Sequence, residues 1–268
     1  MQQLITAINK VSTGRQPSSF SVYTSVETQE ILNVPFTKPT LICVLSGKKE
    51  IGQDPKVECT AGNFIVFGDG FGVDMRNIPN NDTYFAMLIE FEKQDFADFN
   101  SAHSKTARLF VGNIEQTMLL ALLQFVEWTR VTPQSLWHQR RRELLHLLVQ
   151  LGYTQITSMA SAPGLTQQIH DIIRRNLPDD ITVESVGKSL GMSESTLRRK
   201  LNSEGTHFQS LKNDIVLGKG LHLLQSTDKS IHFIAMECGY QSQSRFTERF
   251  KQTFGLTPSE LRKTRMTE

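Results

Sequence analysis

Residues 239–258 read GYQSQSRFTERFKQTFGLTP, and this segment organises the second half of the chain. Gly239 and Ser242 come just before a run in which Phe246 and Phe250 lie four residues apart. Glycine takes the left-handed backbone that ends a helix at little cost. Serine accepts hydrogen bonds from the first free N–H groups of the next helix. Because residues four apart share one helix face, the segment predicts a helix end, a tight turn and an amphipathic second helix.

An earlier segment repeats this arrangement. Gly191 corresponds to Gly239, and Leu197 takes the place of Phe246. Each copy reads as a helix-turn-helix unit, at about 183–203 and about 231–254. The helical spacing of residues 207–224 predicts a long helix that joins the two units, and Thr257-Pro258 predicts the start of a final helix.

The second helix of each unit carries the positive charge of this half. Such a helix can enter the major groove of DNA, where arginine pairs with guanine, glutamine with adenine, and either cation with phosphate. The net charge is +2 for the chain, −1 for residues 1–160 and +3 for 161–268. One helix-turn-helix is also a common way to pack helices, but two copies with cations on both second helices favour DNA binding. The polar candidates are Arg198, Arg199 and Lys200 in the first unit, and Gln243, Arg245, Arg249 and Lys251 in the second.

Residues 165–262 closely resemble the DNA-binding domain of the AraC/XylS family of bacterial transcription regulators. Gly191-Met192-Ser193 and the run from Gly239 to Pro258 carry the resemblance. It implies a cytoplasmic, non-enzymatic activator that binds promoter DNA in two successive major grooves and contacts RNA polymerase. Short members of this kind resemble virulence and secretion-system activators. By position, the resemblance implies base contacts from Ser195, Arg198, Arg199, Gln243, Ser244, Arg245 and Glu248, and phosphate contacts are expected from Lys200, Arg249 and Lys251.

Two features depart from the family pattern. Glu248 stands where the family often has arginine, so it either reads a cytosine or turns away from the phosphates. Gly218 and Gly220 lie in the predicted joining helix and weaken it by roughly 1 kcal/mol each relative to alanine.

The first half predicts a separate β-rich domain. Between residues 18 and 92, short runs of Val, Ile, Phe and Tyr alternate with Gly, Asn, Asp and Pro, which is typical of a sandwich or small barrel. The family resemblance implies a cupin-like domain here. Two amphipathic helices follow in residues 115–152 and predict a helical hairpin. We therefore expect a regulatory or dimerisation domain at 1–155, a linker at 156–164 and the DNA-binding domain at 165–268.

The helical hairpin has two interpretations. Its leucine stripe, which includes Leu144, Leu148 and Leu151, either covers the β-domain or forms a homodimer interface. One helical face can serve both purposes, so the sequence leaves both open.

Composition argues against an enzyme, a metal site or a cofactor in the β-domain. Residues 1–102 contain no histidine, which excludes a His-ligated metal in a cupin-like barrel. Cys43 and Cys59 alone cannot hold the zinc that a repair-type methyl acceptor needs. The longest apolar runs are far too short to span a membrane.

The sequence leaves two kinds of regulatory partner possible for the β-domain. Phe64, Phe67, Phe71 and Phe85 could line a pocket for a small apolar or amphipathic effector, or the domain could bind a regulatory protein. An alternative is a domain that only dimerises, with no effector. Arg76 is the only arginine between residues 16 and 107, which disfavours an anionic effector, although Lys38, Lys48 and Lys49 keep one open.

Overall fold

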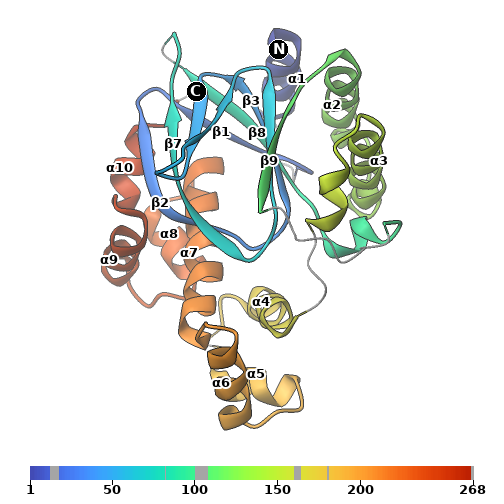
Figure 1. Ribbon diagram of the computed structural model, residues 1–268. Helices are drawn as coiled ribbons and strands as arrows, with labels where there is room; N and C mark the ends of the chain where they lie inside the picture. Colours follow the sequence, from blue (N-terminus) through green and yellow to red (C-terminus); the bar gives the residue numbers. More distant parts are fainter. Residues whose placement is uncertain (13–17, 82, 100–107, 160–163, 180, 267–268) are drawn as a thin grey trace.

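The computed structural model describes residues 1–12, 18–81, 83–99, 108–159, 164–179 and 181–266 (Figure 1). The predicted fold class is confirmed: a β-rich domain with a helical hairpin precedes an all-helical domain. In the part of the chain described, no helix is long and apolar enough to cross a membrane.

Two antiparallel sheets form the β-domain. The five-stranded sheet has the order β1 (Ser21–Ser25), β8 (Tyr84–Glu90), β3 (Thr40–Ser46), β6 (Asn63–Phe67) and β9 (Leu109–Asn113). The four-stranded sheet has the order β2 (Gln29–Phe36), β7 (Phe71–Ile78), β4 (Lys48–Ile51) and β5 (Val57–Thr60).

The sequence of β8 is apolar on both faces of the strand, and the structure buries both faces. Phe85 and Met87 point into a core shared with the N-terminal helices. Tyr84, Ala86 and Leu88 point into the opposite core, toward the second sheet and the C-terminal helices. Successive side chains of a strand alternate between faces, so one strand supplies both cores.

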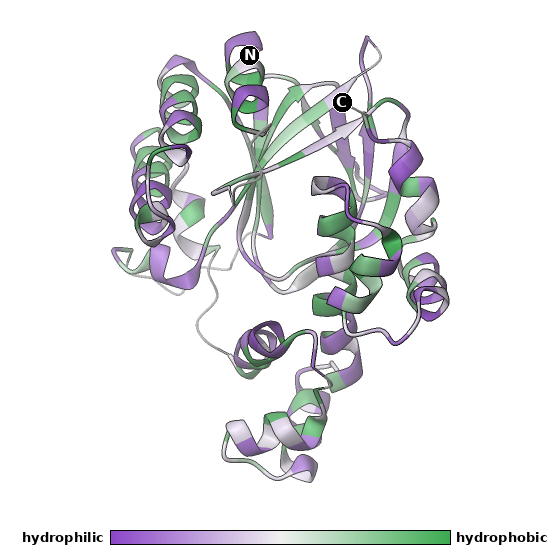
Figure 2. Ribbon diagram, turned by 180° about the vertical axis from the view of Figure 1, so that it is seen from behind, coloured by the Kyte–Doolittle hydropathy of each residue, from purple (hydrophilic) through white to green (hydrophobic). Residues whose placement is uncertain are grey.

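Helices α1 (Gln2–Ser12), α2 (Gln116–Thr129) and α3 (Trp137–Gln150) cover the outer face of the five-stranded sheet (Figure 1). In Figure 2 the strands in the middle of the β-domain are largely hydrophobic, and the hydrophilic residues of these helices lie mainly toward the outside. Leu144 and Leu148 are fully buried in this core, while Leu151 is partly buried. The leucine stripe therefore covers the β-domain of its own chain.

Short 3-10 helices connect these elements: η1 (Lys93–Phe96), η2 (Gln134–Leu136) and η3 (Thr154–Ser158). Helix η3 begins before residue 155, the expected end of the first domain, and extends into the expected linker at 156–164. Ile156 is fully buried there against the outer core, so residues 154–159 belong structurally to the β-domain. Residues 160–163 of the expected linker lie outside the described part.

The helical domain contains α4 (Leu165–Asn176), α5 (Val183–Ser189), α6 (Glu194–Ser203), α7 (Phe208–Ser226), α8 (Ile231–Glu237), α9 (Gln243–Phe254) and α10 (Pro258–Lys263). α4, α5, α6 and the first half of α7 enclose a core of their own. The second half of α7 packs with α8, α9 and α10 into the same core as the inner faces of both sheets. Figure 1 accordingly shows α5 and α6 projecting away from the sheets, while α8 and α9 lie beside them.

Candidate DNA-binding surface and interdomain pocket

The first helix-turn-helix unit consists of α5 and α6. Gly191 has a φ of 65°, the left-handed conformation predicted for the turn. Gly187 permits the close crossing, since a Cβ there would lie 2.8 Å from the carbonyl oxygen of Met192. Ser193 caps α6 by accepting a hydrogen bond from the backbone N–H of Thr196, and Leu197 anchors the helix in the core.

The second unit repeats this construction with α8 and α9. Gly239 has a φ of 76°, and Ser242 accepts a hydrogen bond from the backbone N–H of Arg245. Phe246 and Phe250 are fully buried. Gly255 ends α9 with a φ of 81°, and the start of the helix after Ser242 lies where the sequence predicts it.

Both second helices leave their polar faces in solvent. Within the described residues, Arg199, Lys200, Arg245 and Lys251 take part in no ion pair, so their charges are available to a ligand. All of the predicted contact residues are exposed: Ser195, Arg198, Arg199 and Lys200 on α6, and Gln243, Ser244, Arg245, Glu248, Arg249 and Lys251 on α9.

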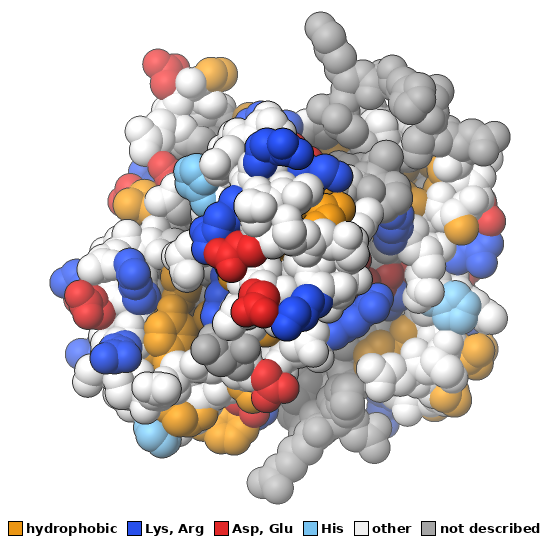
Figure 3. All heavy atoms as spheres, turned by 90° about the horizontal axis from the view of Figure 1, so that it is seen from below, with side chains coloured by type: hydrophobic (Ala, Val, Ile, Leu, Met, Phe, Trp, Pro, Cys, Tyr) orange, Lys and Arg blue, Asp and Glu red, His pale blue; other side chains and the backbone are white. Residues whose placement is uncertain are grey.

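Two acidic residues moderate the positive charge of these faces. Glu194 forms an ion pair with Arg198 at 2.7 Å, one turn along α6. Glu248 accepts a hydrogen bond from Gln252 at 3.3 Å within α9. Figure 3 looks onto the projecting first unit and shows Lys and Arg side chains interspersed with acidic ones.

A pocket of about 320 Å³ lies between the β-domain and helices α4 and α7. Its wall on the β-domain side comes from β1, β2, β3, β4, β7 and β8, and α7 forms the opposite wall. Apolar side chains such as Ile42, Leu88 and Leu221 line its middle. Large apolar cavities with a few polar groups are the usual form of small-molecule sites.

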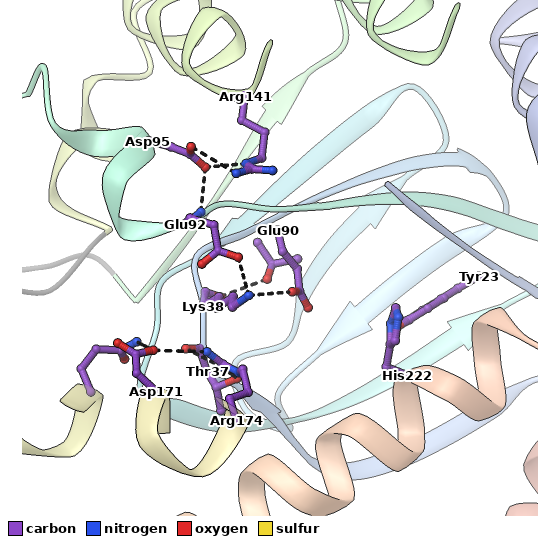
Figure 4. Close-up of polar contacts among 12 residues, drawn as sticks. Tyr23, Thr37, Lys38, Glu90, Glu92, Asp95, Arg141, Asp171, Arg174 and His222 are labelled. Carbon is purple, nitrogen blue, oxygen red and sulfur yellow. Dashed lines mark hydrogen bonds and ion pairs between the residues drawn. The ribbon is translucent and has the colours of Figure 1, made fainter. Parts of the chain in front are cut away.

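Charged groups gather at one end of this pocket (Figure 4). Lys38 forms ion pairs with Glu92 at 2.6 Å and with Glu90 at 3.7 Å. Arg174 of α4 donates a hydrogen bond to the carbonyl oxygen of Thr37 at 3.2 Å. The Arg174 contact joins the helical domain to the segment between β2 and β3.

Further along the pocket, Tyr23 Oη lies 2.9 Å from Nδ1 of His222 (Figure 4). Burial lowers the pKa of His222 below its usual range and raises that of Tyr23. Both side chains are therefore neutral at physiological pH. Asp214, also on α7, has its pKa raised by burial to about 6.

Three of the four predicted effector residues, Phe64, Phe67 and Phe85, do not line this pocket. Phe64 and Phe85 are buried in the outer core, and Phe67 stacks on Phe36 at a centroid distance of 3.9 Å inside the β-domain. The side chain of Phe71 lies outside the described part. The expected pocket was therefore placed wrongly, because aromatic residues in a small β-domain are taken up by its two cores.

Two of the three lysines noted in the sequence do line the pocket, namely Lys38 and Lys49, whereas Lys48 pairs with Glu50 at 2.8 Å. Sequence reasoning missed Tyr23 and His222. Lys49 was named from the sequence as one of the lysines that leave an anionic effector open. In the structure Lys49 lies in β4 and is buried together with its neighbours Glu50 and Ile51.

Comparison with known proteins places the chain in a family. A helix-turn-helix domain model matches residues 186–264. The transcriptional activator PerA of Escherichia coli O127:H6 is 30% identical over 222 residues, which cover 80% of this chain and 79% of PerA. The chain belongs to the AraC/XylS family of transcription regulators. This family consists of regulators rather than enzymes, as the sequence predicts.

Other relatives match a smaller part of the chain, and the chain spans about a third of their length. The HTH-type regulator GadX of Escherichia coli O6:H1 is 32% identical over 98 residues, which are 37% of this chain and only 36% of GadX. The full-length fold is similar to ToxT from Vibrio cholerae, with a TM-score of 0.70 at 15% identity over 94% of this chain and 100% of ToxT. A second ToxT structure, described as bound to an unsaturated fatty acid, has a TM-score of 0.67 at 14% identity, covering 94% of this chain and 98% of ToxT.

Proposed function

We propose that this chain is a sequence-specific transcription activator whose DNA binding is controlled by an amphipathic carboxylic acid in the interdomain pocket. The position of α7 carries the proposal. Ile215 faces the pocket and belongs to the core of the first helix-turn-helix unit. Leu221 faces the pocket and belongs to the core that contains the second unit. A ligand that moves α7 therefore acts on both units at once.

In this proposal, α6 and α9 enter successive major grooves. Arg199 and Arg245 have the best access to guanine, since neither is held by an acidic neighbour within the described residues. Ser195, Arg198, Gln243, Ser244 and Glu248 contribute further base contacts, and Lys200, Arg249 and Lys251 contact phosphates. Ion pairing with Glu194 makes Arg198 less available than Arg199.

The DNA test uses the full chain and a binding site selected from random duplexes. Arg199→Ala and Arg245→Ala should each weaken specific binding by about 1–3 kcal/mol. Lys93→Ala in the β-domain is the matched control, because it removes one exposed positive charge outside both units. Affinities of Arg199→Ala and Arg245→Ala equal to that of Lys93→Ala, at fixed salt, would remove the two arginines from the base-reading role.

Ligand control is supported by the pocket's chemistry and by the fatty acid named for the ToxT structure. A carboxylate headgroup fits the charged end, where Lys38 supplies the cation, and the acyl chain fits the apolar middle. Isothermal titration of the full chain with an unsaturated long-chain fatty acid should give saturable binding that Lys38→Met weakens. The same fatty acid should change the affinity for the selected duplex. A chain that binds no fatty acid would refute this part of the proposal.

The proposal includes RNA polymerase as the target of activation and a homodimer as the active form. The hairpin leaves Leu120 and Trp128 half-exposed on its outer side. These side chains, rather than buried Leu144 and Leu148, are the available apolar contacts for a second copy. Sedimentation of Leu120→Glu against the unaltered chain tests this arrangement.

A further inference from the structure

We propose that the end of the pocket opposite Lys38 is a second polar subsite, and that the effector is an elongated carboxylic acid with a hydroxyl group at its far end. The subsite consists of Lys49, Asn77, Tyr84 and Gln225, all of which line the pocket. This inference rests on the proposed function, because it specifies which amphipathic acid the pocket takes.

The pocket's length separates the two ends. Tyr84 and Glu90 both line it from the same face of β8, and six residues of strand span about 20 Å. Asp214 and Gln225 line it from α7, and the eleven residue steps from one to the other span about 16 Å of helix. Glu90 lies with Lys38 at the charged end, so Tyr84 marks the other end of β8, and Gln225 belongs with Tyr84 through the hydrogen bonds that link Asn77 to the segment after α10 and that segment to the end of α7.

Hydrogen bonds and a cation–ring contact tie the far-end groups together. Lys49 Nζ donates to Asn77 Oδ1 at 2.5 Å and lies 5.5 Å from the centre of the Tyr84 ring. Asn77 Nδ2 donates to Gln29 Oε1 at 2.9 Å, and Gln29 Nε2 donates to Thr264 Oγ1 at 2.8 Å. The neighbouring Arg265 donates to the carbonyl oxygen of Leu224, the residue before Gln225.

Two polar atoms at this end are buried without a hydrogen-bond partner among the described residues. They are the hydroxyl of Tyr84, on a side chain that is 1% exposed, and Oε1 of Gln225, on a residue that is 4% exposed. An unsatisfied buried polar atom lowers the stability of the fold by about 1–3 kcal/mol. These two groups therefore destabilise the folded chain unless a ligand forms hydrogen bonds with them. Two such atoms on side chains that line the same pocket therefore indicate a ligand group.

The donor and acceptor character of these atoms favours a hydroxyl group on the ligand. Gln225 Oε1 can only accept a hydrogen bond, whereas Tyr84 Oη and Lys49 Nζ can donate. A ligand hydroxyl donates to the first and accepts from the others, and a methyl end does neither. Lys49 is 2% exposed and has neutral hydrogen-bond partners, Asn77 and Met75. Burial lowers its pKa to about 7, which suits a neutral ligand group better than a second carboxylate.

The subsite also connects the ligand to the DNA-binding domain. Gln225 lies on α7, and the hydrogen bonds from Asn77 through Gln29 end on Thr264, directly after α10. A hydroxyl at this end therefore contacts the last turn of α7 and the network that holds the C-terminal segment.

The experiment compares a long-chain fatty acid with its ω-hydroxy derivative of equal chain length, by calorimetry on the full chain. The hydroxy acid should bind roughly ten times more tightly, as expected for satisfying buried polar groups. In Tyr84→Phe combined with Gln225→Leu, which removes the orphan atoms at nearly constant shape, the ratio of the two dissociation constants should fall to about one. Lys38→Met should weaken both acids and leave the ratio unchanged.

Each outcome bears on the inference. Equal affinities of the two acids for the unaltered chain overturn the far-end subsite and leave the proposed function in place. A preference that survives in the double variant also overturns it, because the hydroxyl is then recognised elsewhere. Binding of neither acid overturns the inference together with the effector part of the proposed function. Far-ultraviolet circular dichroism of the double variant checks that it is folded.

Discussion

Replacing Gly220 with alanine should destabilise the second helix-turn-helix unit, although alanine is the better helix former. A Cβ at Gly220 would lie 2.8 and 2.9 Å from two ring carbons of Phe246. Phe246 is fully buried, and its ring packs against those of Tyr240 and Phe250 at centroid distances of 5.4 and 5.5 Å. The ring is therefore held between Tyr240, Phe250 and the backbone of α7, and it can yield to a new Cβ only by disturbing these contacts.

The magnitude follows from two opposing effects. Alanine in place of glycine stabilises a helix interior by about 1 kcal/mol, whereas overpacking a filled core costs about 1–3 kcal/mol. Because the Phe246 ring is enclosed, we expect the upper part of that range and a net loss of about 1–2 kcal/mol in the free energy of unfolding. Gly218→Ala is the matched control on the same helix. Its Cβ meets only Pro35 Cγ, at 3.1 Å, and Pro35 is partly exposed.

The assay is urea unfolding of the unaltered chain and both variants, followed by circular dichroism. Gly218→Ala should gain up to about 1 kcal/mol, so the two variants should differ by about 2 kcal/mol. If Gly220→Ala gains as much stability as Gly218→Ala, then Phe246 does not depend on a glycine at 220 and the packing argument is wrong.

Two further predictions concern buried ionisable groups. Burial lowers the pKa of His170 from 6.5 to about 4, so the unfolded chain binds the proton first as pH falls. As the pH falls from about 7 to 4.5, the unaltered chain should therefore lose about 2–3 kcal/mol more of its free energy of unfolding than His170→Gln does. Urea unfolding at both pH values measures this difference, and an equal loss in the two chains would contradict it. Arg141→Met should cost about 3–5 kcal/mol, because it leaves the fully buried Asp95 without its cation. Arg142→Met, whose partner Asp98 is partly exposed, should cost under about 1 kcal/mol, and equal losses would argue against a buried ion pair.

Local chemistry made the helical domain predictable from the sequence. Gly191, Gly239, Ser193 and Ser242 act within a few residues of themselves, so the turns and helix starts they specify appear where the sequence places them. The β-rich character of residues 18–92 was predictable for the same reason, since it depends on strand propensity and turn residues.

Long-range packing limited what the sequence could reveal about the pocket. Lys49 and Gln225 are far apart in the chain, and only the docking of α7 against the sheets places both in one cavity. The phenylalanines failed as a guide because a buried aromatic ring contributes equally to a core or to a cavity wall. Helix α1 was missed as well, although Leu4, Ile8 and Val11 have helical spacing and pack against the β-domain; a segment of 11 residues is short for such a pattern to stand out.

The first helix-turn-helix unit has a core of its own, whereas the second shares its core with the β-domain, and this difference affects any fragment that lacks the β-domain. A fragment that begins at about residue 163 would keep the small core around Leu197 and Ile215 intact. It would also strip the sheets from Leu217, Leu221 and their neighbours, which pack in one continuous core with the β-domain. Exposed apolar surface of this kind promotes association. The helical half is thus a poor candidate for independent solubility, and a truncation that replaces Leu221, which faces the β-domain across the pocket, with a polar residue should remain monomeric where the plain fragment aggregates.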